Sequence, residues 1–202
     1  MATTEELLQT ILQSLEKVEY IKSEDIPNID LYMDQVLTFM DRKLRSAVRP
    51  QTEDRVLTKT MINNYAKNDL LPPPVKKKYS KEHMFLLIFL YYFKNVLSIS
   101  DIQKIFAPLT EMFFGGKSDD ISLEDIYKEI FTMEKELTNN LTKDVVRRFR
   151  SSQEIFSEVT DEAESDYLSR FAYICMLSFD VYIKKQLIER IIDETLEDPG
   201  KK

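Results

Sequence analysis

The chain has 202 residues, and its proportions of hydrophobic (43%) and charged (31%) residues exclude an intrinsically disordered protein. One cysteine and one histidine exclude an internal disulfide and a metal site built from several such ligands, and the net charge of −7 disfavours unspecific binding to polyanions. Three glycines and a predominance of Leu, Ile, Lys and Glu favour helices over sheets, so an all-α fold is expected.

No segment of the sequence has the character of a membrane anchor or a secretion signal. The N-terminus, MATTEELLQT, lacks both a positive leader and an apolar signal core. The longest uncharged apolar run, residues 84–93, has ten residues, whereas a membrane helix needs about 20. Together with the single Cys175, which fits a reducing compartment, these features predict a cytoplasmic protein with no membrane partner.

Positive charge is concentrated in one window of this acidic chain. Residues 1–41 hold two Lys/Arg against nine Asp/Glu, and residues 82–202 hold fifteen against twenty-three. Residues 42–81 hold eleven against three. Most charged runs are only solvated faces, but a block of this size beside three consecutive prolines indicates a surface for a polyanion.

Two amphipathic helices are predicted in the first 45 residues. From Thr4 to Val18, Leu and Ile recur at helical spacing behind a threonine cap, which gives a helix with one apolar stripe. After a break at Pro27, apolar residues including Tyr32 recur on one face. A second helix is therefore expected from about Asp30 to Arg45.

The next segment, LTKTMINNYAKNDLLPPPVKKKYSKEH (residues 57–83), has the clearest functional pattern. Thr58 is a predicted N-cap, and apolar residues at three- and four-residue spacing turn one side of a helix over 58–68 inward. The opposite side carries short polar and cationic side chains that can donate to base edges and phosphates, and Asn can pair with adenine. The predicted DNA-facing residues of this helix are Lys59, Thr60, Asn63, Asn64 and Lys67.

A basic turn follows that helix. The three prolines 72–74 hold the chain extended, because proline fixes its own backbone and restricts the preceding residue. Three lysines are then expected on a short exposed turn, where they can bind phosphates. These residues are Lys76, Lys77 and Lys78.

Two further helices complete the first half of the chain. The helix from Ser80 to about Val96 is apolar on every side between residues 84 and 93, so it should be the buried central helix. A short helix capped by Ser98 or Ser100 and closed by Pro108 should follow. The turn-rich segment FFGGKSDD predicts a boundary at about residues 114–121. The expected divisions are an N-terminal helix over 1–19, a domain over 20–113 and a helical region over 122–198.

Two long helices are predicted in the C-terminal region. A heptad-like apolar seam continues less regularly to Phe149, and a second helix should extend from about Asp161 to Leu196. These helices could close a bundle within one chain or form a homodimer interface, and the sequence leaves both open. The regular part of the seam consists of Leu123, Ile126, Ile130, Met133 and Leu137.

Three segments of the first half, YAKNDLLPP, KYSKEH and SISDI, occur in an order that resembles the winged helix-turn-helix of MerR-type regulators. In that family a recognition helix ending in Tyr-Glu-x-x-Gly-Leu-Leu-x-Pro precedes a wing, an Arg-Tyr-Ser helix start and a Phe-Ser-Leu-x-Glu-Ile helix. Residues 20–110 also resemble an uncharacterised Firmicutes family of predicted DNA-binding proteins. This likeness rests on IPNIDLYMDQV, LTKTMINNYAKNDLLPPP, KKYSKEH and LSISDIQ.

The resemblance implies further DNA contacts. Tyr65 stands at a family tyrosine that approaches the DNA backbone, and Lys78 with Tyr79 stands at the Arg-Tyr of the wing. Asp69 occupies a family glycine position, and it is expected to keep the turn because Asp tolerates left-handed backbone better than most residues. Three further substitutions depart from the family pattern, namely Asn63 for Arg, Asn64 for Tyr and Ala66 for Glu. The helix before the recognition helix is also longer than in the family, and about a dozen residues separate the two helices where a MerR protein has a tight turn.

Nothing in the sequence marks a catalytic centre. His83 lies in the first turn of a helix, where a capping role is expected, and the one Gly-Gly pair lacks the Lys-Ser/Thr of a phosphate loop. We therefore expect no enzyme and no cofactor. The favoured hypothesis is a sequence-specific bacterial transcription regulator that binds double-stranded DNA. The alternative is a non-catalytic protein-interaction module that has kept the helical scaffold without DNA binding.

Overall fold

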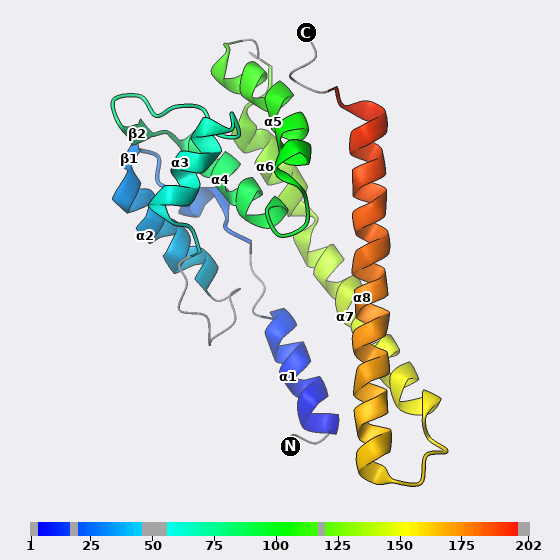
Figure 1. Cartoon of the computed structure of the whole chain (residues 1–202). Coiled ribbons are helices and arrows are strands. Elements are labelled where there is room, and N and C mark those ends of the chain that lie inside the picture. Colours follow the sequence, from blue (N-terminus) through cyan, green and yellow to red (C-terminus); the bar gives the residue numbers. More distant parts are fainter. Residues whose placement is uncertain (1–3, 17–19, 46–55, 117–119, 198–202) are drawn as a thin grey trace. The chain divides into compact units, whose positions relative to one another are not determined.

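The predominantly helical structure of the chain confirms the all-α prediction (Figure 1). The computed structural model describes residues 4–16, 20–45, 56–116 and 120–197, so Val18 and the predicted domain ends at 19 and 198 lie outside it. The chain forms two compact units, one of residues 1–19 and 132–187 and one of residues 20–131 and 188–202. Among the described helices, none combines the length and apolarity needed to cross a membrane.

The larger unit combines helices with one short antiparallel ladder. Strand β1 (Leu31–Tyr32) pairs with β2 (Lys78–Tyr79), with Leu31 opposite Tyr79 and Tyr32 opposite Lys78. The pairing joins the start of one helix to the start of another that is distant in sequence. The helical elements of this unit are η1 (Ser23–Asp25), α2 (Met33–Leu44), α3 (Lys59–Lys67), α4 (Lys81–Phe93), α5 (Ile99–Phe114) and α6 (Leu123–Thr132).

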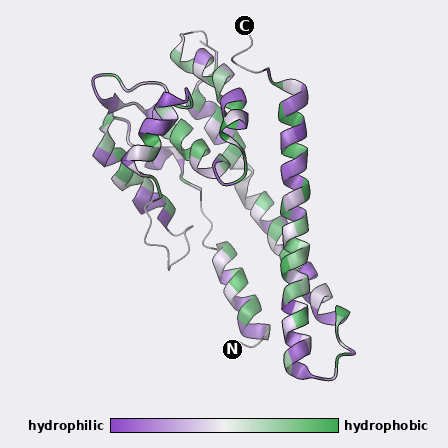
Figure 2. Ribbon diagram, viewed as in Figure 1, coloured by the Kyte–Doolittle hydropathy of each residue, from purple (hydrophilic) through white to green (hydrophobic). Residues whose placement is uncertain are grey.

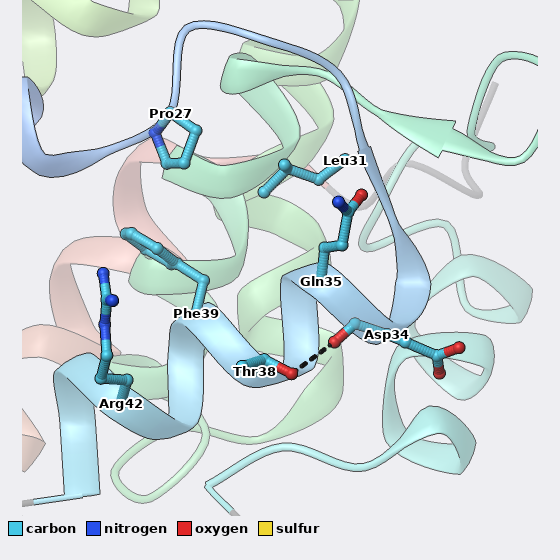
Figure 3. Close-up of a pocket in the computed structure, with 7 residues that line it drawn as sticks. All are labelled: Pro27, Leu31, Asp34, Gln35, Thr38, Phe39 and Arg42. Atoms are coloured by element: carbon cyan, nitrogen blue, oxygen red, sulfur yellow. Dashed lines mark hydrogen bonds between the residues drawn. The ribbon is translucent and has the colours of Figure 1, made fainter.

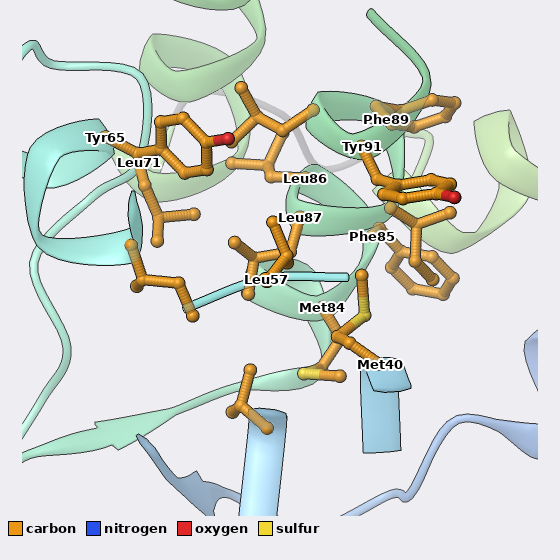
Figure 4. Packing of buried hydrophobic residues seen from close by; sticks show 14 of the residues in the cluster. Met40, Leu57, Tyr65, Leu71, Met84, Phe85, Leu86, Leu87, Phe89 and Tyr91 are labelled. Carbon is orange, nitrogen blue, oxygen red and sulfur yellow. The ribbon is translucent and has the colours of Figure 1, made fainter. Parts of the chain in front are cut away.

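Helix α4 lies at the centre of the core, as its uniformly apolar sequence predicted. Every residue from His83 to Tyr91 is buried. Met40 of α2, Tyr65 of α3 and the adjoining Leu57 and Leu71 belong to the same cluster, which Figure 4 shows around α4. Because each large apolar side chain contributes about 1.5–3 kcal/mol on full burial, α4 is the main anchor of the unit.

The helix starts follow the predicted caps. Thr58 Oγ1 accepts a hydrogen bond from the Met61 N–H at 3.2 Å, and Ser98 Oγ accepts one from the Asp101 N–H at 3.1 Å. Both bonds satisfy backbone donors that the first helical turn leaves without partners. Thr58 and Ser98 are therefore confirmed as N-caps.

Helix α5 continues through Pro108, so the prediction of a short helix closed there is wrong. Proline inside a helix removes one backbone hydrogen bond and costs about 3 kcal/mol. The last turns stay helical because Leu109, Phe113 and Phe114 pack against the core. The helix ends at Phe114, with Gly115 as its C-cap.

Helix α6 also belongs to the larger unit, so the compact units differ from the predicted divisions 20–113 and 122–198. Tyr127 is only 1% exposed, and its ring lies 4.7 Å from the ring of Phe85 and 5.6 Å from that of Phe89. Its hydroxyl donates to the carbonyl of Ile21. These contacts attach α6 to α4, and the unit extends to residue 131. The end of α8 joins the same core through Ile192.

The smaller unit is built by α1 (Thr4–Glu16), α7 (Glu134–Ile155) and most of α8 (Glu162–Thr195). Its core contains Val145, Phe149 and Tyr173, and the rings of Phe149 and Tyr173 meet edge to face at 5.3 Å. The apolar stripe predicted for the N-terminal helix packs against this core. The stripe residues that do so are Leu7, Leu8, Ile11 and Leu15.

The regular part of the predicted heptad seam does not form the interior of the smaller unit, whereas its continuation at Val145 and Phe149 does. Ile130, Met133 and Leu137 are 51%, 57% and 55% exposed. The seam assumed one continuous helix, but α6 ends at Thr132 and α7 begins at Glu134, so its residues do not share one helix. Hydrophobic residues also recur along α8 (Figure 2). The large exposed apolar residues of α8 include Tyr167, Phe171, Ile174, Tyr182 and Ile183.

Candidate nucleic-acid interface

Helix α3 presents a polar face to solvent because the core takes up its apolar residues. Ile62 is fully buried, and Met61 packs against the core from the side. The opposite face is exposed, as the spacing predicted. The exposed residues are Lys59, Thr60, Asn63, Asn64 and Lys67.

The first turn of α2 lies beside the start of α3. Lys59 Nζ and Asp34 Oδ1 are 3.4 Å apart, and both side chains are largely exposed. Exposed pairs of this kind contribute at most about 1 kcal/mol, so Lys59 can exchange Asp34 for another anion at little cost. In Figure 3 the Thr38 hydroxyl, one turn further along α2, donates to the Asp34 carbonyl at 2.8 Å.

Helix α3 ends in a Schellman motif with Asp69 in the left-handed conformation. Asp69 has a φ of +53°, the Leu70 N–H donates to the Tyr65 carbonyl at 2.9 Å, and the Asp69 N–H donates to the Ala66 carbonyl at 3.4 Å. Glycine is the usual residue at this position. The expectation that Asp69 keeps the turn is confirmed, and the turn delivers Leu71 to the core.

Lys76 and Lys77 form the tip of a two-residue hairpin turn. The Lys78 N–H donates to the Val75 carbonyl at 2.9 Å, and φ is +50° at Lys76 and +67° at Lys77. Two positive φ angles characterise a type I′ turn, which prefers Asn-Gly. A lysine in this conformation costs roughly 1–2 kcal/mol. Within the described residues, only these two lysines and Asp69 among non-glycine residues have positive φ, so strain of this kind is confined to residues 69–77.

The turn presents its lysines to solvent. Lys76 and Lys77 are exposed, and of the lysines on this surface only Lys59 pairs with a carboxylate of the described chain. Lys78 Nζ lies 5.2 Å from the centre of the Tyr32 ring, a cation–π contact that holds the ammonium at the surface. Tyr32 was predicted to face inward but is 53% exposed, because β1 places it opposite Lys78.

The two tyrosines for which the resemblance implied DNA contacts lie in the core instead. Tyr65 is 9% and Tyr79 4% exposed, and both rings belong to the core around α4. Burial raises the pKa of both hydroxyls, because the phenolate would be desolvated. Both tyrosines therefore support the surface from within the core. The predicted DNA-facing residues that remain at the surface are the polar face of α3 and the three lysines of the turn.

His83 connects the base of the turn to the core. It is 3% exposed, and its ring meets those of Tyr79 and Phe114 edge-on at 5.6 and 4.8 Å. The Ser80 N–H donates to Nδ1 at 3.1 Å, which confirms the predicted capping role. Nδ1 therefore carries no proton in the neutral ring, and the buried Nε2 carries it. Cys, His, Asp and Glu residues within the described ranges form no group of three that could bind a metal ion.

We expect the stability of the protein to fall as the pH is lowered below about 6.5 because of His83. Burial lowers the pKa of His83 below its ordinary 6.5, while the backbone of Pro72 and Pro73 and the charges of Glu82 and Asp30 oppose the shift. As the pH falls, the unfolded chain therefore binds a proton at His83 before the folded protein does. The unfolding free energy should have its full value above pH 6.5. Below that pH it should decrease by up to about 1.4 kcal/mol per pH unit, until the pH passes the lowered pKa of the folded state.

Urea unfolding at several pH values measures this decline, with His83→Gln as the matched variant. Glutamine at this position can still accept from the Ser80 N–H but does not titrate. No other histidine is present, and the ordinary pKa values of Asp and Glu, about 3.9 and 4.3, lie below the pH range of this decline. Equal slopes for both proteins between pH 6.5 and 5 would contradict the assignment.

A family model described as a domain of unknown function (DUF1836) matches residues 21–130. This range contains the polar face of α3, the lysine turn and the helices α2, α4 and α5, and it ends within α6. Comparisons with curated proteins and with solved structures found no match.

Proposed function

The chain belongs to the DUF1836 domain family, and from the surface formed by residues 58–78 we propose that it is a sequence-specific DNA-binding transcription regulator of the bacterial cytoplasm. One observation carries the proposal: a helix face of Asn, Thr and Lys lies next to a strained turn whose two lysines have no carboxylate partner among the described residues. Strained backbone persists where the surrounding structure holds it for a function. A polyanion is the ligand that this combination fits.

In the proposed complex, α3 lies in the major groove of double-stranded DNA. Asn63 and Asn64 reach base edges, and each paired amide contact contributes about 1–3 kcal/mol of discrimination. Thr60 and Lys67 lie on the same face and flank these contacts. Lys59 leaves its ion pair with Asp34 and binds a backbone phosphate. Lys76, Lys77 and Lys78 on the turn bind further phosphates.

The element order supports a MerR-like arrangement for this complex. A short strand, β1, precedes α2, and the lysine turn between α3 and β2 returns the chain to pair with β1. The turn is thereby fixed against α2 and held close to the end of α3. A helix in the groove with an adjacent turn on the phosphates is the contact pattern of a winged helix-turn-helix.

We also propose that two copies of the chain associate through α7 and α8. Monomeric proteins rarely expose large continuous apolar surfaces, yet Tyr167, Phe171 and Ile174 follow one another at helical spacing and are each more than half exposed. A second copy offers the same helical face, as a symmetric interface requires. Sedimentation equilibrium of the whole protein tests this association.

A protein-interaction module is the second candidate, and a hollow on α2 favours it. The hollow of about 380 Å³ is lined by the apolar side chains of Pro27, Leu31 and Phe39 and by the polar side chains of Gln35 and Arg42, among others (Figure 3). An apolar side chain of a partner protein would fit such a hollow. Retention on random duplex DNA at moderate salt separates the two functions, because only a DNA-binding protein is retained.

Replacing Asn63 with Ala should relax sequence choice without changing general DNA affinity. Loss of one paired base contact costs about 1–3 kcal/mol on the preferred site, which is roughly 5- to 150-fold, and nothing on a scrambled duplex. Fluorescence anisotropy with a site selected from random duplexes measures both values. The matched control is Asn95→Ala, an exposed asparagine outside α3. If Asn63→Ala binds both duplexes like the Asn95→Ala variant, α3 does not read the bases.

A further inference from the structure

The ladder of β1 and β2, beside the start of α2 in Figure 1, has a core face and an outer face. Leu31 and Tyr79 are opposite each other and buried, so they form the core face. The neighbouring pair, Tyr32 and Lys78, lies on the outer face, because side chains alternate along a strand. Val75 forms a further antiparallel bridge with Lys78. Directly opposite residues share a face, so Tyr32, Lys78 and Val75 form one row, which we call the outer row.

The outer row exposes apolar surface where the solvated face of an antiparallel sheet usually carries polar side chains. Val75 is 69% and Tyr32 is 53% exposed. Lys78 lies between them, with its ammonium over the Tyr32 ring. A single exposed apolar residue is common, but here an aromatic and a branched side chain flank the same lysine. The outer row therefore alternates apolar and cationic groups.

The charge of the ladder restricts what the outer row can bind. Three lysines at residues 76–78 stand against Asp30 beside β1, so residues 30–32 and 75–79 together carry a net charge of +2. Such a surface attracts an anionic partner, and the exposed apolar side chains require apolar groups next to the anionic ones. The DNA backbone has this composition, because the carbon atoms of a deoxyribose lie between successive phosphates.

The order of the side chains favours DNA over a lipid surface or a protein strand. Lys76 and Lys77 occupy the tip of the turn, and Val75 lies behind them. Binding to a membrane would bury apolar side chains about 5–10 Å deep, and the lysines at the tip would have to enter the lipid first. Addition of a strand to β1 is disfavoured, because the Tyr32 N–H already donates to Gln35 Oε1 at 2.9 Å.

The outer row is connected to the start of α3, the helix proposed to read the bases. Two residues after Tyr32, the Asp34 carboxylate lies 3.4 Å from the Lys59 ammonium at the first residue of α3. A duplex contacted by α3 would therefore pass close to the ladder.

We propose that the outer row is a second DNA-contacting surface, which packs its two apolar side chains on the deoxyribose edge of the backbone. This inference rests on the proposed function and adds Tyr32 and Val75 to its contacts. Lys78, between them, binds the phosphate that separates two sugars. Burial of apolar groups depends little on salt, whereas phosphate contacts weaken as the salt concentration rises. The outer row therefore contributes a part of the affinity that salt does not remove.

The test is the affinity of the whole protein for a random-sequence duplex, measured by fluorescence anisotropy over a range of salt concentrations. Val75→Ser should weaken binding ~5-fold at every salt concentration, and Val75→Ile should tighten it ~2-fold. Tyr32→Ser should weaken it by a factor similar to that of Val75→Ser. The plots of log K against log salt for both Val75 variants should be parallel to that of the wild type. The matched control is Ile130→Ser, a half-exposed apolar residue of α6, which should bind like the wild type.

The outcomes separate this inference from the proposed function. Wild-type affinity in the Val75→Ser protein would overturn the inference alone, and so would a change of its salt slope by the ~0.9 of one lost phosphate contact. A wild type that does not bind the duplex would overturn the proposed function as well.

Vesicles of phosphatidylserine and phosphatidylcholine test the lipid alternative. If Val75→Ser abolished binding to these vesicles and left DNA binding unchanged, the outer row would serve a membrane and the inference would be overturned. Because Val75 is mostly exposed, its variants should unfold at the same temperature as the wild type, so a loss of affinity reports a lost contact.

Discussion

Replacing Lys76 with Asn and Lys77 with Gly is expected to make the protein more stable and, at the same time, to weaken its binding to duplex DNA. Both lysines have positive φ, and Asn-Gly is the sequence that this turn prefers. The relief of left-handed strain should raise the unfolding free energy by about 1–2 kcal/mol. Removal of two phosphate contacts should lower affinity roughly tenfold and reduce the slope of log K against log salt by about 1.8.

Thermal unfolding and a salt titration of DNA affinity measure the two effects on the same protein. Because the variant is more stable, a loss of binding cannot be attributed to unfolding. The matched control is Lys22→Gln with Lys128→Gln, which removes the same charge from exposed positions outside α3, the turn, α7 and α8 and should leave the salt slope unchanged. A stabilised variant with wild-type DNA binding would show that the turn does not contact phosphates.

Replacing Tyr127 with Ala is expected to destabilise the larger unit by about 3–5 kcal/mol. The side chain is almost completely buried, and its ring also lies 4.3 Å from that of Phe131 in addition to its contacts with α4. Removing it leaves a cavity between α4 and α6 that the rigid core cannot fill. Hydrogen exchange of the α4 amides reports the loss directly, since these amides lie at the centre of the affected core.

Two related variants identify the cause of this destabilisation. Tyr127→Phe keeps the ring but leaves the Ile21 carbonyl without its donor, so it should cost about 1–2 kcal/mol. Ile130→Ala, on the same helix but half exposed, should change stability by less than about 0.5 kcal/mol. If exchange in α4 were the same in the Tyr127→Ala protein as in the wild type, α6 would not be part of the core.

The features that the sequence predicted correctly depend on neighbouring residues. A cap such as Thr58 bonds a residue three positions away, and the polar side of α3 follows from the helical period alone. The burial of α4 also follows from its composition, because a helix that is apolar on all sides must be covered. The exposed turn with its lysines was predicted from the three prolines that precede it.

The features that could not be predicted from the sequence depend on residues far apart in the chain. Pro108 stays helical because the residues beyond it pack on α4, and Tyr127 attaches α6 through side chains about forty residues earlier. Tyr65 and Tyr79 were assigned to the surface by family position, whereas their burial is decided by α4 and its neighbours. One hollow is lined by both Asp69 after α3 and Thr110 of α5, and no local pattern could bring these two residues together.

The pairing of β1 with β2 has a consequence for how the protein folds. It brings residues 31 and 79 together, and closing so long a loop has a large entropic cost that local helix formation does not share. Helices α3 and α4 can form early from nearby contacts, whereas the ladder must wait until α2 has docked. The lysine turn therefore gains its final conformation late, and changes within it should alter the rate of unfolding more than the rate of folding.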